Sequence, residues 1–236
     1  MKKFFLLLML CLHSAFGFGQ RTYEFDYILE YQHRHEDTGE LHTYFYLTNS
    51  LDNSYILSIH DLPNNVYSLR FTHLDGSHGS ATISKSDFFK AESMTMNCDN
   101  FHHHKNDETW RNQYKIDNPG DTIINAISHK RYCYKPANPK KEKRRRLSTT
   151  TFIIEPGTEF HLPILHNVRA FNEWKAGAPI PSGIVKQSYY KKPKQKGMIR
   201  VNTLISYTKI KKFIVVPAEC YDRTPIKPKV ISSYRK

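Results

Sequence analysis

The chain contains 236 residues, of which 13% are aromatic and only 10 are glycine. This content of large apolar side chains is sufficient for a folded core and excludes a largely disordered chain. The formal net charge of +13 is compatible with a nucleic-acid partner, but the export signal described next argues against one, and we expect none.

The N-terminus has the three parts of a secretory signal peptide. Residues 1–3 form a basic head, residues 4–12 carry no charge, and small residues follow. We therefore expect a signal peptide over residues 1–19, with cleavage between Gly19 and Gln20. Because no run of the chain reaches the roughly 20 apolar residues of a membrane span, we expect no transmembrane segment in the mature protein. The protein should be exported, and be periplasmic, outer-membrane-associated or secreted.

Three cysteines remain after this cleavage, namely Cys98, Cys133 and Cys220. An exported protein meets an oxidising compartment, so one disulfide with one free thiol is one expectation, and three reduced thiols are the other. The spacing of the three residues does not select a pair.

Residues 23–32 predict the β-strand around which the sheet should be organised. Every odd position from Tyr23 to Tyr31 holds a large apolar side chain, whereas most even positions are polar. Successive side chains of a strand point to opposite faces, so this alternation predicts a half-buried strand. The abundance of tyrosine and phenylalanine at the odd positions also favours a strand over a helix.

Short polar turns separate the strands that follow, and these connections are too short for parallel crossovers. The first half is therefore predicted to be an antiparallel meander, with strands at 41–48, 55–60, 66–73 and 80–84. A hairpin register in which residue numbers sum to 102 places the apolar residues of the first two on one face. This register sets Leu47 opposite Tyr55 and His42 opposite His60.

The second half predicts further strands and few helices. Short helices are expected at 87–96, capped by Asp87, and at 167–175, capped by Asn167. The fold class is thus mostly β: an antiparallel meander curved into an open barrel or half-barrel, with one or two short helices. Residues 20–236 should form a single domain, with an exposed basic loop at 136–146 and an irregular tail from about residue 217. Two domains that divide near Glu108 are the alternative.

The two halves of the chain carry opposite charge. Residues 20–127 contain 8 Lys and Arg against 16 Asp and Glu, whereas residues 128–236 contain 25 against 6. Separate domains would each retain their self-repulsion, so we predict that a strand after Ser128 pairs with residues 23–32. Ion pairs across the strands should contribute to this pairing. The acidic residues are Glu24, Asp26 and Glu30, and the basic residues are Lys186, Arg200, Lys209, Lys211 and Lys212.

Two histidines of the predicted hairpin suggest a metal site. If His42 and His60 are opposed, their β-carbons lie about 5 Å apart, and Asp61 follows the second histidine. Imidazole and carboxylate groups are ligands of zinc. The sequence therefore leaves two alternatives open. One is a metal-dependent enzyme that uses these three residues, and the other is an ordinary polar pair of histidines.

Two basic runs are candidates for binding a polyanion. Outside the cytoplasm the available polyanions are lipid head groups, lipopolysaccharide phosphates and acidic polysaccharides. A solvated surface without a specific ligand is the alternative. The candidate residues are Lys140, Lys141, Lys143, Arg144, Arg145, Arg146, Lys191, Lys192, Lys194 and Lys196.

The second half also resembles the secreted β-rich proteins of the GLPGLI family of Bacteroidetes-type bacteria. The resemblance rests on residues 122–125 (TIIN), residues 132–134 (YCY), Trp174 and residues 179–184 (PIPSGI). The hexapeptide that names the family is absent, and residues 181–185 (PSGIV) stand where it would begin. The resemblance implies an envelope location and a β-rich fold, and it implies no chemistry.

The sequence contains no nucleophile elbow, phosphate loop, H-E-x-x-H motif or paired cysteine ligands. We therefore favour a non-enzymatic, exported cell-envelope protein that acts as a binding or structural module and needs no cofactor. An envelope polyanion or lipid head group is the expected partner. The metal-dependent enzyme and the polyanion-binding protein are the alternatives, and the oligomeric state is left open.

Overall fold

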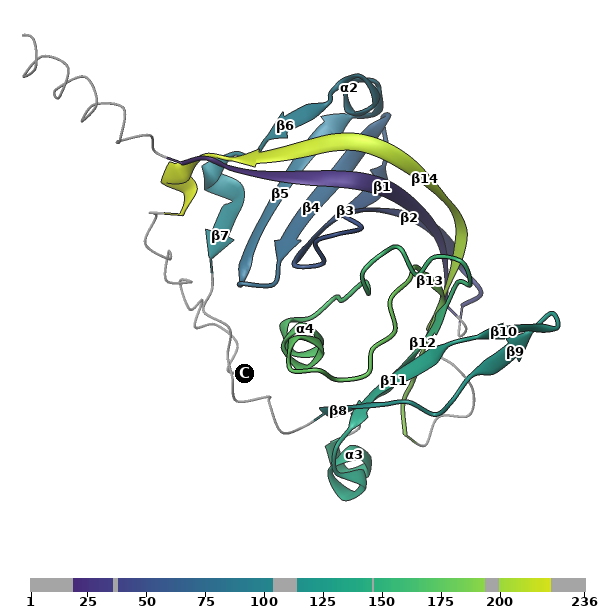
Figure 1. The fold of residues 1–236 in the computed structure, drawn as a ribbon. Helices are drawn as coiled ribbons and strands as arrows, with labels where there is room; N and C mark the ends of the chain where they lie inside the picture. Colours follow the sequence, from purple (N-terminus) through teal and green to yellow (C-terminus); the bar gives the residue numbers. More distant parts are fainter. Residues whose placement is uncertain (1–18, 36–37, 104–113, 146, 194–199, 222–236) are drawn as a thin grey trace, which may run out of the picture.

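The computed structural model describes residues 19–35, 38–103, 114–145, 147–193 and 200–221, in which a long sheet curves around an inner layer of chain (Figure 1). The expected signal peptide lies almost entirely outside the described residues. The strands are β1 (Arg21–His35), β2 (Leu41–Thr48), β3 (Tyr55–Leu62), β4 (Val66–His73), β5 (Ser77–Ser84), β6 (Ser93–Thr95), β7 (Phe101–His103), β8 (Tyr114–Asp117), β9 (Thr122–Ile124), β10 (Ile127–His129), β11 (Arg131–Pro136), β12 (Thr149–Ile154), β13 (Val185–Lys191) and β14 (Arg200–Val216). The α-helices are α2 (Lys85–Lys90), α3 (Pro139–Arg145) and α4 (Val168–Lys175).

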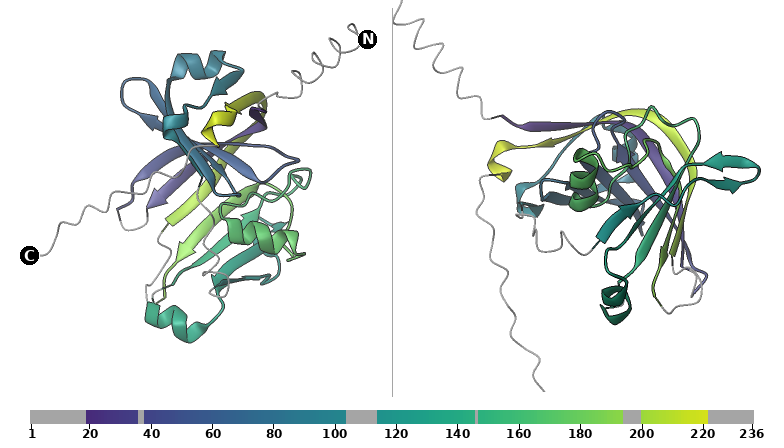
Figure 2. Two further views of the ribbon diagram at one scale, coloured as in Figure 1. Left: turned by 90° about the vertical axis from the view of Figure 1, so that its left-hand side faces the viewer. Right: turned by 60° about the horizontal axis from the view of Figure 1, so that its bottom comes forward.

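Twelve strands form one sheet, in the order β7-β5-β4-β3-β2-β1-β14-β13-β12-β11-β8, with β6 beside β14. Every pair is antiparallel except β6 with β14, which is parallel. Strands β9 and β10 form a separate hairpin. The sheet bends strongly without closing, so the predicted half-barrel of antiparallel strands is confirmed (Figure 2).

β1 lies near the middle of the sheet, as the alternation of its residues predicts. The odd-numbered side chains from Tyr23 to Tyr31 are buried, and none is more than 6% exposed. On one side β1 pairs with β2, and on the other it pairs with β14 over almost its whole length, from Arg21 opposite Val216 to His35 opposite Arg200. The predicted pairing of the first strand with a strand after Ser128 is therefore confirmed.

The ion pairs predicted between β1 and β14 are not formed. Lys209 is opposite Tyr27 and Lys212 is opposite Phe25. The Lys212 ammonium group instead donates hydrogen bonds to backbone carbonyl oxygens of Phe88 and Ala91, at 2.7 and 2.6 Å. No ion pair of the described residues joins the two strands. Backbone hydrogen bonds and buried apolar side chains therefore join β1 to β14. Ion pairs between the two halves form elsewhere, between Lys211 and Glu92 and between Lys135 and Asp117.

The predicted hairpin register is wrong by two residues. β2 and β3 pair with Tyr44 opposite His60 and Leu47 opposite Leu57, so the residue numbers sum to 104. A shift of two keeps each side chain on its predicted face, which is why the hydrophobic pattern could not distinguish the two registers. His42 lies instead opposite His33 of β1.

The helices follow local capping chemistry. Asn167 caps α4 as predicted, because its side-chain oxygen accepts a hydrogen bond from the Ala170 backbone amide at 2.8 Å. α2 is shorter than the predicted helix and is capped by Ser84, and residues 93–95 form a strand. The prediction of a basic loop at 136–146 is wrong in part, because the helix α3 occupies residues 139–145. Proline at its first position and the lysines and arginines that follow favour a helix.

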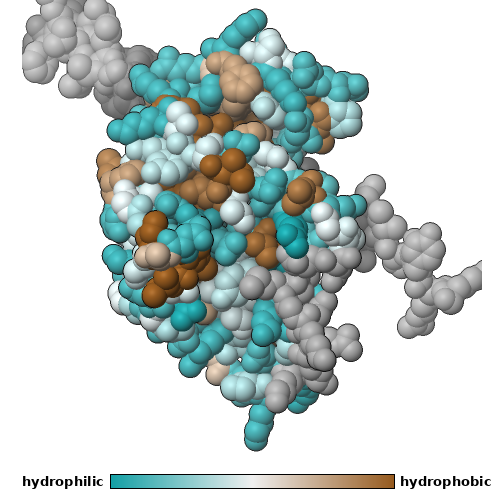
Figure 3. All heavy atoms as spheres, turned by 90° about the vertical axis from the view of Figure 1, so that its right-hand side faces the viewer, coloured by the Kyte–Doolittle hydropathy of each residue, from teal (hydrophilic) through white to brown (hydrophobic). Residues whose placement is uncertain are grey.

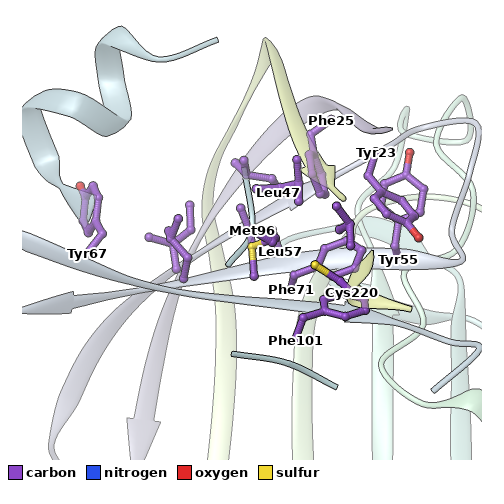
Figure 4. Close-up of a cluster of buried hydrophobic side chains, with 14 of the residues drawn as sticks. Tyr23, Phe25, Leu47, Tyr55, Leu57, Tyr67, Phe71, Met96, Phe101 and Cys220 are labelled. Atoms are coloured by element: carbon purple, nitrogen blue, oxygen red, sulfur yellow. The ribbon is translucent and has the colours of Figure 1, made fainter. Parts of the chain in front are cut away.

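Two apolar clusters pack against the curved sheet. The first gathers the ends of β1 and β14 with β3, β4 and β5, where Tyr23, Phe25 and Phe71 pack together (Figure 4). The second joins the middle of β1 to the segment that contains α4, which lies inside the arc of the sheet (Figure 1). Cys98 and Cys220 form a disulfide beside the first cluster. Cys133 is the free cysteine of the described residues.

Hydrogen bonds close the inner segment, residues 155–184, by joining its two ends to each other. The Glu155 amide donates to the Ile184 carbonyl oxygen at 2.8 Å, and the Gly183 amide donates to the His161 carbonyl oxygen at 2.7 Å. Gly183 has φ +129°, and a β-carbon there would lie 2.4 Å from the Ile154 side chain. Only glycine fits this close approach, which explains the sequence PSG at the end of the segment.

The predicted irregular tail begins with a short 3₁₀ turn, Ala218–Cys220, and residues 222–236 lie outside the described residues. Within the described parts of the chain, no helix has the length and apolar character needed to cross a membrane.

Candidate functional site

A pocket of about 510 Å³ lies at the end of β1 that is remote from the disulfide. We call it the concave pocket. Its lining residues come from β1, β2, β12, β13 and β14 and from the turn after β1. They are His33, His35, Glu40, His42, Tyr44, Tyr46, Thr150, Ser188, Tyr189, Tyr190, Arg200 and Asn202.

The strand register brings these side chains together from distant parts of the chain. Residues directly opposite each other on neighbouring strands project from the same face of a sheet. His33 is opposite His42 on β2 and opposite Asn202 on β14, and Asn202 is opposite Ser188 on β13. One row across four strands therefore supplies part of the pocket wall.

A chain of hydrogen bonds fixes this row. The Nδ1 hydrogen of His33 is donated to the Asn202 side-chain oxygen at 2.5 Å, and the Asn202 amide group donates to the Ser188 hydroxyl oxygen at 3.1 Å. When the His33 ring is neutral, Nε2 then has no hydrogen and is an acceptor. The polar wall is thus oriented before any ligand binds.

Aromatic rings form the rest of the wall. Tyr44 packs edge-on against His60 and His33, with ring centroids 4.7 and 5.7 Å apart. Tyr46 packs against Tyr31, with ring centroids 5.6 Å apart. Burial raises the pKa of Tyr46 and lowers that of His60. The Tyr46 hydroxyl therefore remains protonated at neutral pH and the His60 ring neutral.

One buried polar atom of the pocket has no hydrogen-bond partner within the described parts of the chain, namely Nδ1 of His35. A buried unpaired polar atom costs free energy, so such atoms are uncommon. His35 also lines the concave pocket with the accessible part of its ring.

A small inner compartment continues the concave pocket toward the second apolar cluster. It has a volume of about 30 Å³ and shares Tyr46, Ser188 and Asn202 with the pocket. Its other lining residues are Leu29, Tyr31, Phe152, Ile164, His166 and Val185. A cavity needs roughly 10–15 Å³ to hold one water molecule, so the compartment has room for about two water molecules and none for an acyl chain.

The residues predicted for a metal site are not brought together. His42 lines the concave pocket, His60 lies opposite Tyr44 on the adjacent strand, and Asp61 forms an ion pair with Lys85 at 2.6 Å. No group of three or more histidine, cysteine or acidic side chains that could hold a metal ion occurs in the described ranges. The metal site was suggested because the predicted hairpin register set His42 opposite His60. That register is wrong by two residues.

The two basic runs adjoin the same end of the sheet as the concave pocket. Thr149, the first residue of β12, is opposite Lys191, the last residue of β13. The first run, Lys140 to Arg146, precedes β12, and the second begins with Lys191 and Lys192 and precedes β14. Lys140, Arg144, Lys191 and Lys192 are exposed, whereas Arg146, Lys194 and Lys196 lie outside the described residues.

Sequence reasoning missed most of the concave pocket. The available signal was in β1, where the odd-numbered face changes from aromatic residues to His33 and His35. This change indicates that the buried face ends in a polar site. The partners Ser188, Arg200 and Asn202 could not be identified, because long-range strand register is not encoded in local alternation.

Comparison with known proteins gives the chain no family. No family model matches it, and no curated protein matches it. Membership of the GLPGLI family therefore stays a prediction.

Several solved structures show remote similarity. The Pseudomonas aeruginosa MucA/MucB complex matches with a TM-score of 0.41 and 7% identity, over 78% of this chain and about half (51%) of that chain. A putative outer membrane lipoprotein-sorting protein domain from Vibrio parahaemolyticus matches with a TM-score of 0.32 and 10% identity, over 86% of this chain and 91% of that one. A LolA superfamily protein from Nitrosomonas europaea matches with a TM-score of 0.30 and 9% identity, over 78% and 85%.

Proposed function

We propose that the protein is an exported, non-enzymatic envelope protein that binds an acidic saccharide in the concave pocket. The observation that carries the proposal is the lining of the pocket, which combines tyrosine rings, histidines, amide and hydroxyl groups and Arg200.

Export is supported by the disulfide together with the N-terminal sequence. Disulfides persist in oxidising compartments and are rare in the cytoplasm. Cys98 and Cys220 are 122 residues apart and both are buried in the same cluster, so their bond is part of the fold.

The volumes favour a compact polar ligand over a lipid tail. The concave pocket, at about 510 Å³, lies within the range of roughly 300–1,000 Å³ that is usual for small-molecule sites. The apolar compartment behind it is too small for an acyl chain. A ligand must therefore be held mainly by the polar and aromatic walls.

The side chains of these walls match a sugar ring. The apolar face of a sugar packs on aromatic rings, which Tyr44 and Tyr190 can supply, while its hydroxyl groups exchange hydrogen bonds with groups such as Asn202 and His35. This combination of ring faces and mixed donors and acceptors distinguishes a saccharide from a simple inorganic anion.

The charge around the pocket favours an acidic ligand. Arg200 lies in the wall, and Lys191 and Lys192 follow directly after Tyr190. Glu40 is the carboxylate of the described lining and lies 3.7 Å from the His42 ring. Outside the cytoplasm, acidic polysaccharides are available ligands for such a site.

Calorimetric titration with trigalacturonate tests the proposal, with maltotriose as a neutral sugar of the same length. At 150 mM salt, where long-range attraction is screened, the mature protein should bind trigalacturonate and bind maltotriose more weakly. Arg200→Gln should weaken trigalacturonate binding several-fold. Lys90→Gln, which removes one positive charge from α2, should leave it unchanged. Equal effects of the two variants, or no binding of trigalacturonate, would contradict the proposal.

A further inference from the structure

β14 has an open edge over residues 204–212. One side of the strand pairs with β1, but its other side pairs with β13 only through residues 200–203 and with β6 only through residues 213–215. Between these two contacts no described strand lies beside β14, and residues 205–209 are exposed. Figure 1 shows β14 as the outer strand along β1 between β6 and β13. An exposed edge of this length is a template for another strand.

An apolar groove of about 880 Å³ lies beside the open edge. Four consecutive residues of the edge, 207–210, line it together with Tyr27, Leu51 and Phe160. Leu51 is 81% exposed and Phe160 is 49% exposed, although both are large and apolar. Apolar patches interrupt the hydrophilic surface on the side of the molecule where β14 bends (Figure 3). Exposed apolar surface of this kind marks interaction sites.

The register explains how the edge and the groove could act together. Tyr207 is opposite Leu29 and Lys209 is opposite Tyr27, so Tyr207 and Lys209 project from the same face of β14. A strand added at the open edge would place every second side chain on this face, beside the groove. Strand addition of this kind takes its affinity from backbone hydrogen bonds and its selectivity from pockets for alternate side chains.

The charges of the edge select an acidic partner. Lys209 lines the groove itself. Lys211 lies on the same edge with its side chain 67% exposed and pairs with Glu92 at 3.1 Å. Lys212 is buried and adds no exposed charge, because it binds backbone oxygens. The groove carboxylate, Asp26, already accepts hydrogen bonds from the Ser50 amide, at 2.8 Å, and from the Ser50 hydroxyl.

The chain itself does not provide a complementary strand of this charge. Residues 194–199 contain two lysines and no acidic residue, residues 222–236 contain five basic residues and one acidic residue, and residues 104–113 contain two of each. A second copy would bring the same cations to its own edge. We propose that the open edge and the apolar groove bind an extended acidic segment of another polypeptide by β-strand addition.

Hydrogen exchange of the full mature protein tests this proposal, with a nine-residue probe peptide of alternating valine and glutamate. The amides of residues 204–212 should exchange more slowly when the peptide is present. Two control peptides separate the contributions: one with lysine in place of glutamate, and one with alternate backbone nitrogens methylated. Neither should protect these amides, because the first has the wrong charge and the second cannot complete the strand ladder.

Variants make the test specific. Lys209→Glu should weaken binding of the acidic peptide several-fold, whereas Lys90→Glu, the same change on α2, should not, provided that circular dichroism shows both variants folded. The proposal is overturned if the methylated peptide binds equally well or if both variants weaken binding equally. It is also overturned if, without any peptide, the amide hydrogen exchange of residues 204–212 becomes slower as the protein concentration rises. A second copy of the chain would then cover the edge.

Discussion

Tyr31 donates its phenolic hydrogen to the carbonyl oxygen of Val185 at 2.6 Å, although the two residues are 154 positions apart in the sequence. This buried bond spans from β1 to β13, while β14 lies between them in the sheet. Burial raises the pKa of Tyr31 well above its usual value, so the hydroxyl stays protonated and remains a donor. Both residues line the inner compartment, so the bond fixes the base of the concave pocket.

Tyr31→Phe should therefore destabilise the protein by about 1–3 kcal/mol, because the buried Val185 carbonyl oxygen would lose its partner. Urea unfolding followed by circular dichroism measures this change. Tyr207→Phe removes the same hydroxyl group from an exposed side chain and should have little effect. Equal stability of the Tyr31→Phe variant and the wild type would show that the bond contributes nothing.

The disulfide should contribute substantially to stability. It closes a loop of 122 residues, for which the chain-entropy relation gives a stabilisation of about 4–5 kcal/mol. Replacing both Cys98 and Cys220 by serine should lower the free energy of unfolding by an amount of this order. The matched control is Cys133→Ser, which should have a smaller effect because its hydroxyl can keep the contact with Thr151, where sulfur and oxygen are 3.3 Å apart. If the double variant unfolds at the same urea concentration as the control, the disulfide is not a stabilising element.

Acid should destabilise the fold through His161. Its Nδ1 hydrogen is donated to the Leu162 carbonyl oxygen at 2.6 Å, and Nε2 then accepts from the Thr48 hydroxyl at 2.9 Å. Burial lowers its pKa, even though the Leu162 bond and Asp26 act in the opposite direction. The unfolded chain thus takes up the proton first, so the stabilisation is complete above about pH 6.5 and decreases as the pH falls through the folded-state pKa.

The measurement is the unfolding free energy between pH 7.5 and pH 5. His161→Asn keeps a side-chain donor but cannot be protonated in this range, so its stability should depend less steeply on pH than that of the wild type. His42→Asn, at a side chain that is 53% exposed, serves as the control. If the free energy of unfolding of His161→Asn depended more steeply on pH than that of the wild type, protonation of His161 would not be the cause of the acid destabilisation.

The first half of the chain should not fold alone. A fragment of residues 20–127 would expose one edge of β1 and would lack Ile214, Val216 and Cys220 from the first apolar cluster. We expect it to unfold without a cooperative transition in urea, and we expect the mature chain to show one. A cooperative transition of the fragment would support the two-domain alternative.

The fold was predictable where the local pattern and the buried face agree. The odd-numbered residues of β1 set its orientation, and Asn167 identified the start of α4. The register of β2 with β3 was not predictable, because a shift of two residues preserves the buried face and alters only which residues are opposed. The pairing of β1 with β14 was expected from charge, yet no ion pair of the described residues joins these two strands, and Lys212 binds backbone oxygens instead. The ion pairs between the halves lie elsewhere, as between Lys211 and Glu92.

The candidate site was less predictable than the fold. The histidine that the sequence selected, His42, does line the concave pocket, but its neighbours there are His33 and Tyr44 and the predicted partner His60 lies on the next strand. Asn202 and Arg200 reach the pocket only because β14 pairs with β1 across more than 160 positions. No local signal specifies which residues of so distant a strand lie opposite β1.

The most direct test of the proposed function is the nuclear magnetic resonance of histidine rings during titration of the mature protein with trigalacturonate. The ring signals of His33, His35 and His42 should shift together and saturate with one dissociation constant. The ring of His129 is buried and hydrogen-bonded to the Ile154 carbonyl oxygen at 2.9 Å, so its signal should not move. Unchanged signals of the three pocket histidines at saturating sugar would contradict the account.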